Sequence, residues 1–157
     1  MIQRIQSIYL LLVMIVLSVV AVGTELFSFV SETTRFTFSS FGITHYSLEG
    51  KVLEHKSMPV YIGLIALILL SFLCLMAYKS LARQFKLGRT VFFLYLLMVV
   101  SMILLAFLGD SLVEGEHLKR ELGLGFYLFV AGLPFSFMAN TGIKRDKKLL
   151  DSLDRLR

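Results

Sequence analysis

The fold is decided by residues 58–78, which read MPVYIGLIALILLSFLCLMAY and carry no Asp, Glu, Lys, Arg or His. A helix rises about 1.5 Å per residue, so about 20 apolar residues cross the roughly 30 Å hydrocarbon core of a bilayer. Three further stretches have a similar length and the same lack of charge, at 5–24, 91–109 and 122–141. We therefore predict an all-α, polytopic membrane protein with four transmembrane helices in one bundle. A single membrane domain would take in residues 1–157.

The composition of the chain agrees with a place in the membrane. Hydrophobic residues make up 57% of the sequence and charged residues 17%, whereas soluble domains have about 45–50% and about 25%. Four apolar stretches would leave too little polar sequence to cover a soluble core, which excludes a soluble globular enzyme. The lone cysteine, Cys74, excludes an intramolecular disulfide, a Cys-x-x-Cys redox pair and a thiolate metal cluster within one chain.

The first stretch has a competing interpretation as a signal peptide. Arg4 would supply the positive segment, and Ala21-Val22-Gly23 resembles a cleavage site with small residues at its two ends. The apolar run is longer than the roughly 7–15 residues of such a signal. We therefore favour a retained span.

Lys and Arg are unevenly distributed between the two sides of the predicted spans. One side takes the N-terminus, the connection between the second and third spans, and the tail 142–157; the other takes the segments 25–57 and 110–121. The first side holds eleven of these residues: Arg4, Lys79, Arg83, Lys86, Arg89, Lys144, Arg145, Lys147, Lys148, Arg155 and Arg157. The second side holds five: Arg35, Lys51, Lys56, Lys119 and Arg120. By the positive-inside rule, both termini are predicted to be cytoplasmic.

The two outside segments differ in character. In 25–57, Phe36 and Phe38, and then Phe41 and Ile43, alternate with small and polar residues, which is a period-two pattern typical of strands. We expect a small β-hairpin or meander there, with its aromatic face on the helix ends or at the lipid interface. The segment 110–121 is predicted to be a short loop.

The tail 142–157 has helical periodicity. Its leucines follow at i, i+1, i+4 and i+7, at positions Leu149, Leu150, Leu153 and Leu156. We predict a short amphipathic C-terminal helix with Asp146 as its N-cap.

Ionisable side chains are absent from the predicted spans, which argues against a proton or ion pathway. His45, His55 and His117 fall in outside segments, so a haem held between helices is not expected. The sequence predicts no catalytic residue, no metal ligand and no cofactor. An acid/base or metal site built from these histidines and the acids of the outside segments stays open as the enzymatic alternative, although their spacing matches no known signature. The outside acids are Glu25, Glu32, Glu49, Glu54, Asp110, Glu114, Glu116 and Glu121.

The fourth stretch is the least lipid-like of the four. Four of its small or polar residues are predicted to pack against other helices: Gly125, Gly132, Ser136 and Asn140. Pro134 removes a backbone hydrogen bond inside this helix and predicts a kink. In the alternative interpretation, the loosened backbone lines a small-molecule cavity.

Two cytoplasmic features are predicted to contact lipid headgroups or a partner. They contribute Lys79, Arg83, Lys86, Arg89, Asp154, Arg155 and Arg157. The first three recur at helical spacing with no acid among them, and each cation near an anionic leaflet contributes about 1 kcal/mol. The mixed charges of the tail form an arrangement that a protein partner could recognise.

The two ends of the chain resemble a known family. The opening residues 1–12 read MIQRIQSIYLLL, and the closing part contains Ala139-Asn140, Ile143-Lys144-Arg145-Asp146-Lys147 and Asp154-Arg155-Leu156-Arg157. Together they resemble a family of four-span membrane proteins from Bacteroidota known as domain of unknown function 4293. The resemblance covers the whole chain in architecture and implies a bacterial inner membrane, but no activity, substrate or cofactor.

These observations predict a non-enzymatic accessory or scaffold subunit of the inner membrane. Its expected partners are the bilayer, anionic lipid headgroups, and a membrane-protein partner or a second copy of the chain. Nucleic acid is not expected, because the basic residues lie beside apolar segments rather than in a recognition motif. The alternative is a small-molecule or lipid-binding membrane protein, in transport or lipid modification, that uses a cavity near Pro134 and the outside acids.

Overall fold

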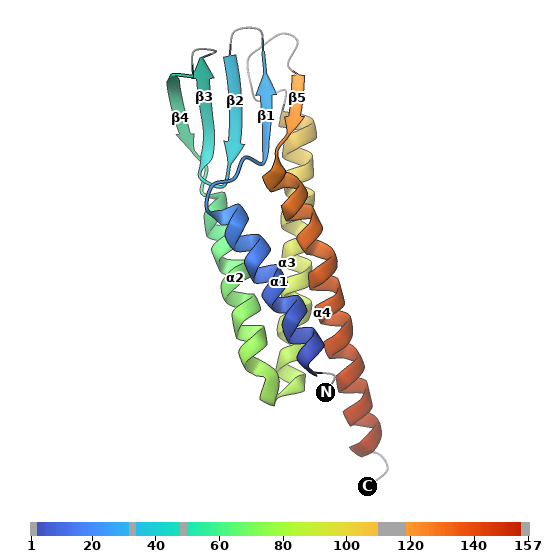
Figure 1. The fold of residues 1–157 in the computed structure, drawn as a ribbon. Coiled ribbons are helices and arrows are strands. Elements are labelled where there is room, and N and C mark those ends of the chain that lie inside the picture. Colours follow the sequence, from blue (N-terminus) through green and yellow to red (C-terminus); the bar gives the residue numbers. More distant parts are fainter. Residues whose placement is uncertain (1–2, 32–33, 48–49, 110–118, 155–157) are drawn as a thin grey trace.

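The computed structural model describes the chain except for residues 1–2, 32–33, 48–49, 110–118 and 155–157. The described residues form two parts stacked end to end, a helix layer and an antiparallel sheet (Figure 1). The helix layer consists of α1 (Gln3–Ala21), α2 (Val60–Met76), α3 (Leu81–Leu108) and α4 (Leu124–Asp154), with the short 3-10 helix η1 (Ala77–Lys79) between α2 and α3. Helix α1 begins and α4 ends at the end of the layer away from the sheet.

The helices pack along stripes of buried residues spaced three or four apart. Helix α1 packs against α2 and α4, and α3 packs against the same two helices from the other side. The buried stripe of α3 includes Val91, Tyr95 and Val99, whereas Leu97 on its outer face is 62% exposed. Apolar side chains on both the inner and outer faces are typical of helices surrounded by lipid.

Three helices in the described part of the chain are long and apolar enough to cross a membrane: Val60–Lys79, Leu81–Leu108 and Leu124–Leu149. The prediction of four such helices is wrong, because the apolar part of α1, Ile5–Ala21, is too short to be counted with these three. The uncharged run continues to Thr24, but the helix ends before it. Gly23 adopts a φ of +102°, and a Cβ there would lie 2.7 Å from the ring of Phe41. This glycine turn ends α1 early.

The all-α prediction is also wrong, because the described residues contain a five-stranded antiparallel sheet. Its strands are β1 (Phe27–Val30), β2 (Thr34–Ser39), β3 (Gly42–Ser47), β4 (Val52–Ser57) and β5 (Lys119–Leu122), in the spatial order β4-β3-β2-β1-β5. The expected meander of the first outside segment is therefore a larger structure than predicted. The predicted short loop 110–121 supplies most of β5, which pairs with β1 (Figure 1).

One face of the sheet is aromatic and rests on the helix layer. Phe27 stacks on Phe38 with ring centroids 4.4 Å apart, and Phe29 meets Phe38 edge to face at 5.8 Å. These three rings share one buried cluster with Met102 and Ala106 of α3. The expected contact of the aromatic face with the helix ends is the one that the structure shows.

Strand β5 fastens the sheet edge to the end of α3. The Arg120 guanidinium donates a 3.2 Å hydrogen bond to the carbonyl of Phe107 and lies 4.8 Å from the centre of its ring. The last carbonyls of a helix lack partners within the helix, so an arginine is a suitable donor there. The sheet and the helix layer are thus joined by both packing and hydrogen bonding.

The tail does not form the separate amphipathic helix that was predicted. Helix α4 runs without interruption from Leu124 to Asp154 and includes Pro134. Asp146 is therefore not an N-cap: it lies within α4, is 7% exposed, and accepts a hydrogen bond from the side-chain amide of Gln6 on α1. Burial against α1 allows the helix to continue where the sequence pattern suggested a new start.

Candidate functional site on the polar face of the sheet

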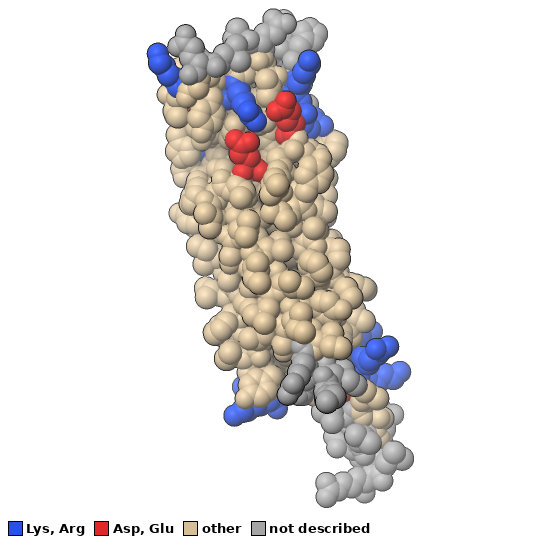
Figure 2. Space-filling view, viewed as in Figure 1, with Lys and Arg blue, Asp and Glu red and all other residues tan. Residues whose placement is uncertain are grey.

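The second face of the sheet is polar, and a hollow of about 450 Å³ lies on it. Strand alternation places Ser28 of β1 beside Thr37 of β2 and Glu121 of β5 on this face. The hollow is lined by Glu25, Val30, Arg35, Thr37, Tyr46, Ser47, Gly50 and Glu121. Figure 2 shows acidic and basic groups side by side at the sheet end of the molecule, above a band that is almost free of charge.

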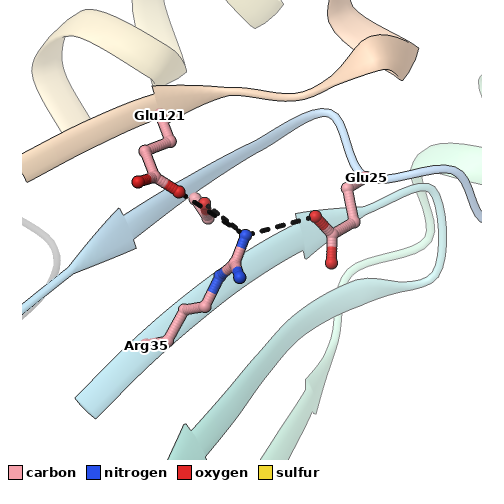
Figure 3. A network of polar contacts seen from close by, with 4 residues as sticks. Glu25, Arg35 and Glu121 are labelled. Carbon is pink, nitrogen blue, oxygen red and sulfur yellow. Dashed lines mark hydrogen bonds and ion pairs between the residues drawn. The ribbon is translucent and has the colours of Figure 1, made fainter. Parts of the chain in front are cut away.

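Arg35 is the centre of a charged network in this hollow. Its Nη2 atom lies 3.4 Å from Glu25 Oε2 and 3.6 Å from Glu121 Oε2 (Figure 3). The same atom lies 3.4 Å from Ser28 Oγ. One guanidinium between two carboxylates gives the network a formal charge of −1.

The segment that holds Glu25 is fixed against the start of α4. The Gly125 N–H donates a 3.0 Å hydrogen bond to the Glu25 carbonyl. A Cβ on Gly125 would lie 2.7 Å from that carbonyl oxygen, and one on Gly123 would lie closer still. Two glycines at the start of α4 therefore allow the backbones to touch, which sets the position of Glu25 beside the helix ends.

A buried hydroxyl group, that of Thr37, belongs to a residue that lines the hollow. Thr37 is 5% exposed, and its Oγ1 has no hydrogen-bond partner among the described residues. Buried polar atoms in native proteins are nearly always hydrogen-bonded to protein, water or ligand. With a guanidinium, two carboxylates and this hydroxyl, the hollow can bind a group that carries both a cation and an anion, or a set of hydrogen-bond donors and acceptors.

The histidines and the remaining acids of the two predicted outside segments do not gather at one site in the described part of the chain. His45 stacks on Phe36 with centroids 4.1 Å apart, His55 Nδ1 lies 3.1 Å from Thr44 Oγ1, and His117 lies outside the described residues. Glu32, Glu49, Asp110, Glu114 and Glu116 also lie outside them. In the part that is described, no group of three His, Cys, Asp or Glu could hold a metal ion.

The predicted packing residues of α4 have different surroundings. Gly125 touches the Glu25 segment, as above. Gly132 and Ser136 are buried, and Asn140 is half-buried beside Gly88 of α3. A Cβ on Gly132 would overlap the hydroxyl oxygen of Tyr95, which donates a 2.8 Å hydrogen bond to the Phe129 carbonyl.

Pro134, beside which a cavity is one interpretation of the sequence, lies within α4. Its side chain is on the exposed side of the helix and is not among the residues that line the hollow on the sheet. On the inner side, the ring and hydroxyl of Tyr95 fill the space left by Gly132. Two of the acids predicted to lie outside, Glu25 and Glu121, line the hollow on the sheet.

Among the residues predicted to contact lipid headgroups or a partner, those that the structure describes lie at the end of the helix layer away from the sheet (Figure 1). Lys79 is on η1, and Arg83, Lys86 and Arg89 are on the first turns of α3; all four are exposed. The side chain of Asp154, and all of Arg155 and Arg157, lie outside the described residues.

A comparison with protein families places this architecture in a known group. The model of the family called domain of unknown function 4293 matches residues 2–156. The chain belongs to this family. No curated protein and no solved structure matches the chain significantly. Membership of domain of unknown function 4293 assigns no activity to the chain.

Removal of the central cation should change binding at the hollow far more than it changes stability. Arg35, Glu25 and Glu121 have side chains that are 42%, 54% and 60% exposed, and exposed ion pairs contribute about 0–1 kcal/mol. Arg35→Gln is therefore expected to lower the free energy of unfolding by less than about 1 kcal/mol, and the difference should shrink at high salt. Thermal unfolding in detergent measures this, with the exposed Lys56→Gln as the charge-matched control. A loss of several kcal/mol for Arg35→Gln alone would show that the network holds the sheet together.

Proposed function

We propose that the chain is a non-enzymatic accessory protein of the bacterial inner membrane that docks a partner on its outside sheet. The observation that carries this proposal is the open polar hollow around Glu25, Arg35 and Glu121, on a sheet whose opposite face is fixed to the helix layer. A surface that holds charged groups in defined positions favours specific docking, because complementary charges set the register of a complex and select the partner.

The proposed orientation has both termini in the cytoplasm and the sheet outside. It is supported by the exposed cations Lys79, Arg83, Lys86 and Arg89, which lie at the end of the helix layer where α1 begins. Positively charged residues near span ends favour the cytoplasmic side. In this orientation the basic residues contact anionic headgroups of the inner leaflet.

Site-specific photo-crosslinking tests the docking function. A benzophenone amino acid replaces Tyr46, which lines the hollow, or Tyr127, a tyrosine of α4 that is 61% exposed and serves as the matched control. We expect a discrete protein adduct from position 46, lost when Arg35→Gln is added, and none from position 127. An adduct from 46 that persists in Arg35→Gln, or adducts from 127 alone, would contradict docking at the hollow.

The unpartnered Thr37 hydroxyl favours a second candidate, in which a small zwitterionic molecule occupies the same hollow. Native mass spectrometry of the purified protein separates the two functions. A bound small-molecule mass that disappears in Arg35→Gln supports this second candidate over the docking of a protein.

A further inference from the structure

A groove of about 300 Å³ lies between α1 and α4, far from the sheet. The walls come from Ile5 and Gln6 of α1 and from Phe137, Met138, Gly142 and Arg145 of α4. A Cβ on Gly142 would lie 2.8 Å from Gln6 Cγ, so the two helices approach closely at the base of the groove.

The walls change from apolar to basic along the helix axis. Phe137 and Met138 are 54% and 44% exposed, and they face the surroundings of the helix layer as other lipid-facing side chains do. Arg145 is exposed two turns further along α4. This order matches a phospholipid, whose acyl chain lies beside apolar side chains while its phosphate meets a cation at the membrane surface.

A buried amide supplies a hydrogen-bond acceptor in the same groove. Gln6 is 2% exposed, and its Nε2 donates to Asp146 Oδ2. That bond directs the amide, yet Gln6 Oε1 has no partner among the described residues. An amide oxygen accepts hydrogen bonds only, so its partner must be a donor.

We propose that this groove binds one phospholipid whose phosphate pairs with Arg145 and whose headgroup donates a hydrogen bond to Gln6. Ethanolamine and glycerol headgroups carry such a donor, whereas the choline headgroup carries none. The site therefore selects among lipids that share the same phosphodiester and acyl chains. It is independent of the hollow on the sheet.

Lipid exchange followed by native mass spectrometry tests this selection. The delipidated full-length protein is titrated in detergent with phosphatidylethanolamine, phosphatidylglycerol or phosphatidylcholine of identical acyl chains. We expect a single bound ethanolamine or glycerol lipid per chain and about tenfold weaker binding of the choline lipid, since an unpaired buried acceptor costs about 1–3 kcal/mol.

Matched variants locate the binding to the groove. Arg145→Gln should weaken the first binding event about tenfold, as expected for loss of a charge-assisted contact, while Lys144→Gln removes a neighbouring exposed cation that does not line the groove. Thr141→Trp, at an exposed position on the rim, should block binding without altering a buried contact. Equal binding of all three lipids, equal effects of Arg145→Gln and Lys144→Gln, or occupancy by a second copy of the chain would overturn the proposal.

Discussion

Gly132→Leu is expected to lower the free energy of unfolding by about 3 kcal/mol or more. The position has no room for a side chain, because a Cβ would overlap the hydroxyl oxygen of Tyr95 and lie 3.1 Å from Val16 Cγ1. Overpacking a core costs about 1–3 kcal/mol, and displacing Tyr95 also breaks its hydrogen bond to the Phe129 carbonyl. Thermal unfolding in mild detergent measures the loss.

A second glycine and a rescue variant make this test specific. Gly63 of α2 serves as the control, because a Cβ there would meet only the flexible end of Met98. Gly63→Ala should leave the melting temperature nearly unchanged, whereas Gly132→Ala should lower it. Adding Tyr95→Phe to Gly132→Ala should restore part of the loss, because it removes the clashing oxygen. An unchanged melting temperature for Gly132→Leu would mean that α4 does not pack against Tyr95.

Phe29→Ala should separate the sheet from the helix layer. The Phe29 side chain is fully buried. Its ring packs against Gly109 at the end of α3, where an added Cβ would lie only 3.2 Å from the ring. Removing a buried phenylalanine side chain costs about 3–5 kcal/mol. Most of that loss should fall on the sheet, since β1 carries the ring.

Hydrogen–deuterium exchange shows where the loss falls. We expect faster exchange of the β1 and β2 amides in Phe29→Ala, with the amides of α2 unchanged. Phe72→Ala removes a ring of the same size that is 46% exposed on α2 and should affect neither part strongly. If the β1 amides exchanged equally slowly in Phe29→Ala and in the unmodified protein, the packing of the sheet against α3 would be contradicted.

Local sequence patterns predicted the apolar helices and part of the sheet. The alternation at Phe36 and Phe38, and at Phe41 and Ile43, identified the region of β2 and β3, although Phe41 lies in the turn between these strands. Strand β5 reads KREL and has no apolar alternation. Its pairing with β1 joins segments about ninety residues apart, so no local pattern could reveal it.

The predicted end of the first helix and the predicted start of a separate tail helix were wrong for a related reason. The uncharged run continues to Thr24, but α1 ends at Ala21, before a turn at Gly23 that packs against the ring of Phe41. Likewise, Asp146 looked like an N-cap until the structure placed Gln6 beside it. Both boundaries are set by tertiary contacts.

The candidate site was the least predictable part. Glu25, Arg35 and Glu121 stood out only as members of the outside acids and cations, and their meeting requires the β1–β2 and β1–β5 registers. The small residue Gly132 was visible as a packing position, but its partner Tyr95 was hidden within an apolar run. Residue types were thus informative, while the pairs they form were not.

We propose that the membrane separates the sheet from the basic end of the helix layer. Single cysteines at Glu54 on β4 and at Arg83 on α3, both exposed, are introduced into a Cys74→Ser background and treated with a membrane-impermeant maleimide in spheroplasts. We predict that Glu54→Cys is labelled in intact spheroplasts and that Arg83→Cys is labelled only after lysis. Labelling of Arg83→Cys in intact spheroplasts, with Glu54→Cys protected, would contradict the account.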